Sequence, residues 1–409
     1  MKLKNIKFNN HKILGNLEVG FLNKDKKILN TVVIIGENGA GKTTLLRSIY
    51  DQMDWNSKID RKIDAKIKLL SSERELKLFT SEVYDSSSLN DWNNIKDKLY
   101  DFSFSEDSNY HINKDNILNE FNSKVIYMPT EINFNNLNRV DRTFKYGYSF
   151  LNEINQNIAS DLPSAIANAI NTEVFKNEDL PPKDSIKKIC NDINSIFECM
   201  NIGVKFIGLS KDEDTKPLFK DSIGNEFDIE GLSSGEKQLF IRALSLKFLN
   251  ANNSIILIDE PEISLHPQWQ RKIIKVYENI GQDNQLIIAT HSPHVVADIK
   301  SEQLRVIRKD ENGVSIVPNE QIEETYFQTY ESILKYTMGL ENTRSDEGQE
   351  KFNKLKTLLK QDLYDNEEFI DIYNYLKSYL GEFDKDLIAI DMEKARRKRK
   401  KEREDAKGR

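Results

Sequence analysis

The 409-residue sequence contains few cysteines and no long apolar run. Its two cysteines, Cys190 and Cys199, fall within one expected helix, and the simplest interpretation is a reduced, cytosolic protein with both thiols in the core. Because no run of about eighteen or more apolar residues occurs, we expect no membrane-spanning helix. The Lys- and Asn-rich beginning of the chain is not typical of a signal peptide. These absences predict a cytoplasmic protein that does not act at a membrane.

Histidine is also scarce, at five residues. His11, His111 and His266 show no ligand spacing with one another or with a cysteine, so the sequence predicts no zinc site. The net charge of −7 argues against a protein that coats DNA uniformly. The one dense basic run, residues 396–403, leaves two interpretations open. It could bind nucleic acid or an acidic partner, or it could be a solvated helix end whose cations suit the helix dipole.

The strongest motif that is present is a phosphate-binding loop. A β-branched run at 31–35 predicts a buried parallel strand, and it leads into Gly36–Thr44, a G-x-x-x-x-G-K-T loop followed by an apolar helical stretch. The glycines allow the backbone N–H groups to surround a phosphate, Lys42 would reach the β- and γ-phosphates, and Thr43 would bind Mg²⁺. The pattern predicts ATP and Mg²⁺ as ligands. The expected nucleotide-binding residues are Asn38, Gly39, Ala40, Gly41, Lys42, Thr43 and Thr44.

A second apolar strand, at 254–258, ends in an acidic pair. Asp259 stands where a strand-end aspartate would hold Mg²⁺ through water, and Glu260 stands where a general base would polarise the attacking water. Without other motifs, this pair would be only a strand end that meets a solvated loop. In a chain that also has a phosphate-binding loop, the acidic pair predicts a catalytic site. A third strand, at 285–290, leads into His291, whereas His294 is interpreted as an ordinary loop or helix-start residue.

Residues 232–238 (LSSGEKQ) predict a helix start that offers hydroxyl and backbone N–H groups to an anion. The phosphate loop, this segment, the acidic strand end and the histidine follow the order of ATP-binding-cassette (ABC) ATPases, which the chain resembles. The resemblance implies an α/β fold: a P-loop NTPase head of the ABC type with an N-terminal antiparallel β lobe, a helical insert and a helical C-terminal extension.

The resemblance also implies how the active site is completed. Ser233, Ser234 and Gly235 would form the signature loop, which grips the γ-phosphate of a nucleotide held by the partner chain. His291 would be the switch histidine at the γ-phosphate, and it would act with Lys42 and Glu260 in catalysis. Residues 262–267 resemble the D-loop, which crosses the dimer interface. Two chains would therefore associate head to tail around two ATP–Mg²⁺.

The strand at 124–128 runs into Pro129-Thr130-Glu131, where ABC transporters have a Q-loop glutamine. No glutamine stands there. Whether Glu131 takes its place stays open.

The motifs divide the chain into four expected regions. These are an N-terminal ABC lobe with the P-loop (1–147), a helical insert (148–202), a C-terminal ABC lobe with the signature, acidic pair and switch histidine (203–318), and a helical extension with the basic tail (319–409). Alternation predicts strands within 1–30, at 66–70 and at 75–79, and a strand meander at 203–229. Residues 86–116 read as loop plus a short helix. In the extension, helices are expected at 330–340, 352–364, 367–380 and 387–394.

Residues 45–231 contain no sustained heptads, which excludes the long coiled-coil arms of chromosome-maintenance ATPases. No Toprim-type acidic cluster follows, so a fused nuclease of the overcoming-lysogenization-defect kind is not expected. Among soluble repair and defence ATPases, this layout most resembles the ATPase subunit of the Septu anti-phage system. That resemblance implies a homodimer or higher homo-oligomer and a separate HNH-type nuclease partner whose cutting is regulated by ATP. Hydrolysis is expected to be slow, because nothing in the sequence suggests a motor or a transport partner. Two alternatives stay open: a DNA-repair ATPase of the RecF type acting on DNA directly, and an ATP-sensing scaffold with little turnover.

Overall fold

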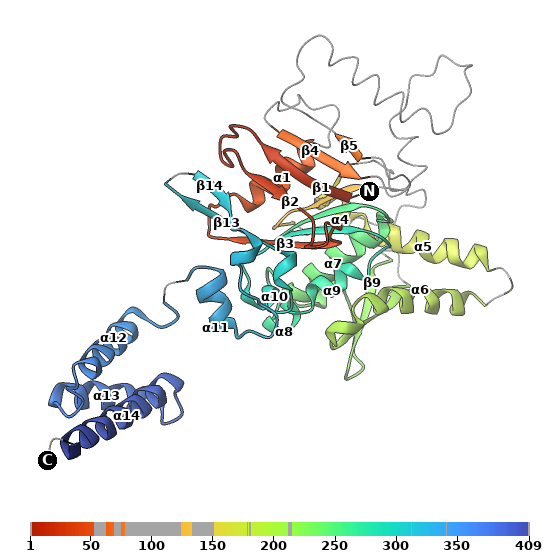
Figure 1. The fold of residues 1–409 in the computed structure, drawn as a ribbon. Helices are drawn as coiled ribbons and strands as arrows, with labels where there is room; N and C mark the ends of the chain where they lie inside the picture. The colour runs from red at the N-terminus through yellow and green to blue at the C-terminus, as the bar shows by residue number, and fades with distance from the viewer. Residues whose placement is uncertain are drawn as a thin grey trace, which may run out of the picture. The chain divides into compact units, whose positions relative to one another are not determined.

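The computed structural model describes residues 2–52, 63–68, 75–77, 124–132, 151–177, 179, 181–211, 215–311, 313–340 and 342–407. The chain divides into two compact units, Met1–Met338 and Gly339–Arg409 (Figure 1). The loop and short helix expected at 86–116, and the expected boundary at 147, lie outside the described residues. Within the described part of the chain, the search for a helix long and apolar enough to cross a membrane finds none.

A seven-stranded sheet forms the centre of the first unit. Its order is β14 (Gly313–Ile316), β13 (Leu304–Asp310), β3 (Thr31–Gly36), β12 (Gln285–Ala289), β11 (Ile255–Asp259), β6 (Val125–Met128) and β7 (Leu151–Glu153). All neighbouring pairs are parallel except β13 with β14. Because parallel neighbours end at the same edge, the residues after β3, β11 and β12 meet there. The predicted α/β P-loop fold is confirmed.

The N-terminal lobe is an antiparallel sheet in the order β2 (Glu18–Gly20), β1 (Lys2–Phe8), β4 (Ile63–Lys68) and β5 (Glu75–Lys77). The strands expected near the N-terminus are present. Gln285 joins this lobe to the central sheet, since its side chain accepts from the Leu3 N–H (2.6 Å) and donates to the Leu3 carbonyl (3.0 Å). A buried amide that satisfies both groups of one strand residue fixes the two sheets in register.

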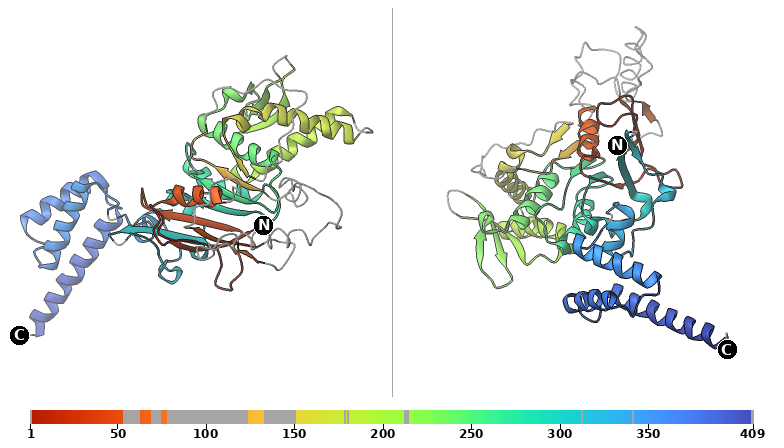
Figure 2. Two further views of the ribbon diagram at one scale, coloured as in Figure 1. Left: turned by 90° about the horizontal axis from the view of Figure 1, so that it is seen from above. Right: turned by 90° about the vertical axis from the view of Figure 1, so that its left-hand side faces the viewer.

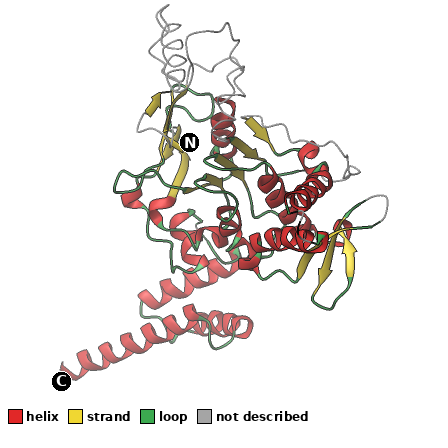
Figure 3. Ribbon diagram, turned by 90° about the vertical axis from the view of Figure 1, so that its right-hand side faces the viewer, coloured by secondary structure: helices red, strands yellow, loops and turns green. Residues whose placement is uncertain are grey.

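The helical insert consists of α4 (Gln156–Ser160), α5 (Leu162–Lys176) and α6 (Pro182–Ile196), followed by the meander β8 (Val204–Leu209), β9 (Pro217–Asp221) and β10 (Glu226–Asp228). The meander is confirmed, and β8 lies beside α6 (Figure 3). The helical region expected from residue 148 is wrong at Leu151–Glu153, which forms a strand that pairs in parallel with β6. Cys199 lies past the end of α6, in a 3₁₀ turn at Glu198–Met200.

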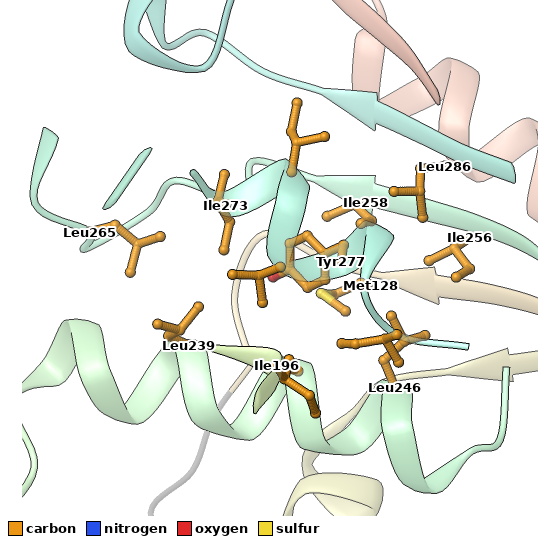
Figure 4. Packing of buried hydrophobic residues seen from close by; sticks show 14 of the residues in the cluster. Met128, Ile196, Leu239, Leu246, Ile256, Ile258, Leu265, Ile273, Tyr277 and Leu286 are labelled. Carbon is orange, nitrogen blue, oxygen red and sulfur yellow. The ribbon is translucent and has the colours of Figure 1, made fainter. Parts of the chain in front are cut away.

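Two hydrophobic clusters cover the two faces of the central sheet. Alternate residues of β3 divide between them: Val33 and Ile35 belong to one, Val32 and Ile34 to the other. The first cluster also holds α7 (Ser234–Phe248), α9 (Ile273–Glu278) and the insert; the second holds α1 (Lys42–Gln52) and the N-terminal lobe (Figure 2). Leu239 and Leu246 of α7 point toward the sheet, with Tyr277 of α9 between (Figure 4). Burial on both faces explains the continuous apolar strands.

The segment that follows the sheet belongs to the first unit. Tyr330–Ser332 (α11) continues into a π-helix at Ile333–Thr337, and Ile333 is buried in the first cluster. The helix expected at 330–340 therefore stops before Gly339, where the second unit begins. The sequence-based division at 319 lies upstream of this point.

The second unit is a bundle of α12 (Asp346–Lys360), α13 (Glu367–Leu380) and α14 (Lys385–Lys407). Its own cluster includes Leu355, Phe369 and Leu387. Arg344, just before α12, pairs with two carboxylates at the start of α14. Its Nη2 lies 2.9 Å from Asp384 and 2.6 Å from Asp386. The three amphipathic helices are confirmed, but α14 continues beyond the expected end at 394 and carries the basic tail.

Candidate nucleotide-binding site

The phosphate-binding loop joins β3 to α1, as its sequence predicts. Gly39 and Gly41 have φ of +78° and +98°, a region that side chains with a Cβ rarely adopt. A Cβ on Gly41 would also lie 2.6 Å from the Leu14 side chain. Asn38 and Gly39 are exposed, whereas Ala40 is buried beneath the loop. The curl of this loop therefore depends on glycine at these positions.

Lys42 is the first residue of α1 and is almost completely buried. Its Nζ donates to the carbonyls of Gly36 (3.0 Å) and Glu37 (3.2 Å) and lies 3.3 Å from His291 Nδ1. Burial lowers the pKa of Lys42, and the nearby carboxylates of Glu260 and Asp259 oppose this. The ammonium is thus held at the mouth of the loop by acceptors that a phosphate could replace.

His291 connects Lys42 to Glu260. An ammonium has only donors, so Nδ1 accepts from Lys42, and the ring proton then lies on Nε2, 3.3 Å from Glu260 Oε1. Burial, followed by the charge of Lys42, lowers the pKa of His291, while Asp259 opposes the shift. The neutral ring with its proton on Nε2 fits both neighbours. Three predicted catalytic residues therefore form one continuous row.

Asp259 ends β11 and is buried. Its Oδ2 accepts a hydrogen bond from Thr130 Oγ1 at 3.0 Å, and its buried Oδ1 has no hydrogen-bond partner among the described residues. A free, buried carboxylate oxygen beside a phosphate loop suits a hard cation such as Mg²⁺. Thr43, exposed at the start of α1 beside Thr44, is the second expected ligand. The residues present thus fit the ion.

Glu260 has unusual backbone and side-chain surroundings. Its φ is +48°, in the left-handed region that non-glycine residues rarely occupy. Burial first, then the carboxylates of Glu262 and Asp259, raise the pKa of Glu260 to about 8. Strained backbone and a strongly shifted carboxyl occur together at functional sites more often than elsewhere.

Arg242 of α7 is buried and was not identified from the sequence. Its guanidinium donates to the carbonyls of Pro129 (2.9 Å) and Thr130 on one side and of Glu260 (3.4 Å) on the other. It thereby fixes the ends of β6 and β11 relative to α7. The sequence feature that could have identified Arg242 is that it is a single cation inside the apolar stretch of α7. At the Q-loop position, Glu131 is exposed, and Thr130 rather than Glu131 contacts Asp259.

The signature segment starts α7 with a capping box. Ser233 Oγ accepts from the Glu236 N–H (3.3 Å), and the Ser233 N–H donates to the Glu236 carboxylate (2.9 Å). Ser233 and Ser234 are exposed, whereas Gly235 is buried, and a Cβ on it would lie 2.5 Å from the Ser264 carbonyl oxygen. The Ser233 hydroxyl also donates to the Glu236 carboxylate (2.7 Å). The structure therefore gathers Lys42, Asp259, Glu260 and His291 and leaves the signature serines facing solvent.

A protein-family model described as "AAA domain, putative AbiEii toxin, Type IV TA system" matches residues 32–297. The chain belongs to this AAA domain family. The matched range runs from β3 through α10 (Pro293–Val296) and contains every site residue described above. The AAA domain of this chain is thus an ATPase domain of the AAA/ABC type.

Several individual proteins are similar to this chain over spans of different length. The chain is 27% identical to Septu protein PtuA of Bacillus thuringiensis over 340 residues, and this match covers 76% of the chain and 79% of that protein. It is 36% identical over 97 residues to the retron Vc95 probable ATPase of Vibrio cholerae serotype O1 biovar El Tor, covering 21% of this chain and 19% of that protein. A solved SMC head bound to the C-winged helix domain of ScpA matches with a TM-score of 0.41 at 13% identity, over 78% of this chain and 97% of the other. The similarity to PtuA confirms the predicted resemblance to the Septu ATPase.

Proposed function

We propose that this chain is a regulatory ATPase of anti-phage defence that pairs with a second copy around ATP–Mg²⁺ and controls an associated nuclease. The observation that carries the proposal is the row from Lys42 through His291 to Glu260, with a distance of 3.3 Å at each step. A phosphate-binding lysine and a carboxyl that can position the attacking water are groups that ATP hydrolysis uses, and His291 links them in one row.

The chemistry follows from these positions. The backbone N–H groups of the loop and Lys42 bind the phosphates of ATP, while Thr43 and Asp259 hold Mg²⁺, which supplies positive charge to the phosphate oxygens. Glu260 accepts a proton from the attacking water, and His291 orients the carboxyl through its Nε2 proton. The water oxygen bonds to the γ-phosphorus as the bond to ADP breaks, giving ADP and phosphate.

Pairing is supported by the signature segment. Ser233 and Ser234 are exposed at the start of a 15-residue helix, where N–H groups and the helix dipole favour an anion. Gly235 is packed against the D-loop. A head-to-tail pair related by two-fold symmetry would place each signature segment at the nucleotide of the other chain.

Control of a nuclease is supported by the similarity to Septu protein PtuA and by the second unit. This unit has its own core and contributes none of the predicted site residues. Phe383 is 92% exposed and Met392 70% exposed on it, and large apolar side chains in such positions are common at protein interfaces. We infer a separate HNH-type nuclease as the partner and slow ATP turnover as the switch.

Phosphate release by the wild type, Lys42→Ala and Glu260→Gln tests the ATPase. We expect turnover only in the wild type, with ATP retained by Glu260→Gln and lost by Lys42→Ala. Wild-type release no faster than that of Glu260→Gln would indicate a scaffold that senses ATP and would contradict the enzyme.

Co-purification with the product of an adjacent HNH reading frame tests the partner. We expect a complex whose DNA cutting changes with ATP. If no complex forms and double-stranded DNA alone stimulates the ATPase, the protein instead acts on DNA directly, as in the RecF type.

A further inference from the structure

Glu262 of the D-loop is buried, with 7% of its surface exposed, which is rare for a glutamate without a specific role. One of its carboxylate oxygens, Oε1, accepts three hydrogen bonds. The donors are the Thr290 hydroxyl, the His291 N–H (3.0 Å) and the Ser292 N–H (3.1 Å). These donors make up the whole segment 290–292, which follows β12 and carries the switch histidine. A single oxygen thus holds the backbone of that segment in place.

Gln270 forms a second bridge between the same two segments. Its Nε2 donates to the Leu265 carbonyl (2.9 Å), and its Oε1 accepts from Ser292 Oγ (2.7 Å). The Ser292 hydroxyl in turn caps α10 by accepting from the His294 N–H (3.1 Å). The D-loop and the switch segment therefore behave as one braced unit.

The position of His291 depends on this brace. Its ring meets Lys42 and Glu260 at 3.3 Å each, so a small shift of its backbone would separate one of the two contacts. At its other end the D-loop touches the signature helix, where the Ser264 carbonyl would lie 2.5 Å from a Cβ on Gly235.

We propose that Glu262 is a positioning residue for ATP hydrolysis, which sets the segment 290–292 so that His291 meets Glu260 and links that segment through the D-loop to the signature helix. The inference rests on the proposed ATPase function. Glu262 touches the switch backbone and thereby sets His291. Burial raises the pKa of Glu260, and the Glu262 carboxyl lies close enough to raise it further.

The test compares Glu262→Ala with Glu262→Gln in the full-length protein. Alanine removes the acceptor, and we expect kcat to fall by about tenfold or more because the switch histidine is misplaced. ATP affinity, measured with a fluorescent analogue, should stay within about threefold because the phosphate loop is untouched. Glutamine keeps an oxygen for the same donors and should retain most of the activity. Glu226→Ala, an exposed hairpin change, is the control and should match the wild type.

Thr290→Val removes one donor with little change of shape and keeps the test decisive if Glu262→Ala does not fold. We expect an intermediate loss in kcat, unchanged ATP affinity and a nearly wild-type melting temperature. A kcat of folded Glu262→Ala within about twofold of the wild type would overturn the proposal, as would equal losses in kcat and ATP affinity. If the wild type hydrolyses ATP no faster than the Glu260→Gln variant, the result would instead contradict the proposed ATPase function itself.

Discussion

Glu260 has two energetically unfavourable features in the nucleotide-free protein. Its backbone is in the left-handed region, and its carboxyl is partly removed from water and lies near other carboxylates. With a pKa of about 8 in the nucleotide-free protein, this carboxyl is only partly ionised near neutral pH, and the ionised form is the one that can accept a proton from water. Such a group makes the stability of the fold depend on pH in a defined direction.

The sign follows from the raised pKa. The folded state binds the proton more tightly than the unfolded chain, so the stabilisation is complete below the ordinary glutamate pKa and is lost as pH rises through about 8. We expect the nucleotide-free wild type to melt at a lower temperature near pH 9 than near pH 6. Glu260→Gln cannot ionise and should show a smaller decrease. Thermal melts of both proteins at the two pH values check this, and equal decreases would contradict it.

Sequence motifs were sufficient to predict Lys42, Asp259, Glu260 and His291 as neighbours, because each follows a buried strand and parallel strands end together. Arg242 and Glu262 could not be assigned in the same way. Most of their partners are backbone groups 18 or more residues away in sequence, and backbone groups leave no trace in residue type. Only the fold shows which carbonyls and N–H groups they hold.

Among the secondary-structure elements, α7 has two functions: it buries Leu239 and Leu246 against the sheet, and it presents the signature serines to solvent. The capping box of Ser233 and Glu236 fixes where the helix begins. This places Ser234 in the exposed first turn, where an added side chain would not disturb the core.

Ser234→Arg should leave ATP binding by the single chain nearly unchanged and abolish ATP-dependent pairing, because the guanidinium would occupy the surface offered to the partner. We expect sedimentation velocity to show pairing of Glu260→Gln with ATP and Mg²⁺ but no pairing once Ser234→Arg is added. Ser195→Arg, on an exposed position of α6, is the matched control. Normal pairing of the Ser234 variant would refute the shared site.

The basic tail is the last part of α14 and has two parts. Arg396 and Arg397 both pair with Glu393 within α14, and Arg397 also pairs with Asp362, past the end of α12, at 2.9 Å. Lys398–Lys401 are exposed.

Replacing Lys398, Arg399 and Lys401 by glutamine should weaken association with the nuclease or with nucleic acid at low salt and leave basal ATPase unchanged. Pull-down and phosphate release measure the two effects. The same change at the exposed Lys183, Lys187 and Lys205 is the control. A fall in the basal rate for the tail variant alone would make the tail part of the ATPase.

Element types were predictable where the pattern was long, as in the strands of the central sheet and in α12 and α13. The short strand β7 was not, because Leu151 and Ile154 are three residues apart and imitate helical spacing. Its conformation is set by pairing with β6. The π-helix after α11 had no sequence signal that distinguishes it from an α-helix.

At the scale of the whole molecule, the proposed shared site gives each chain two incomplete halves of an ATPase site. The phosphate loop, Asp259, Glu260 and His291 form one half; the signature segment, facing solvent, forms the other. Residues 262–267 connect these two parts within the chain, because Glu262 accepts from the His291 N–H and Ser264 packs against Gly235. The second unit has a separate core and is the part of the chain that we propose binds the partner.

The most direct measurement is ATP turnover by a mixed dimer of Lys42→Ala and Ser234→Arg chains, isolated by a different affinity tag on each. Such a dimer has one intact site, formed by the phosphate loop of the Ser234→Arg chain and the signature of the Lys42→Ala chain. The shared-site account predicts about half the wild-type rate per dimer, while each variant alone is inactive. A mixed dimer as inactive as the two separate variants would contradict it.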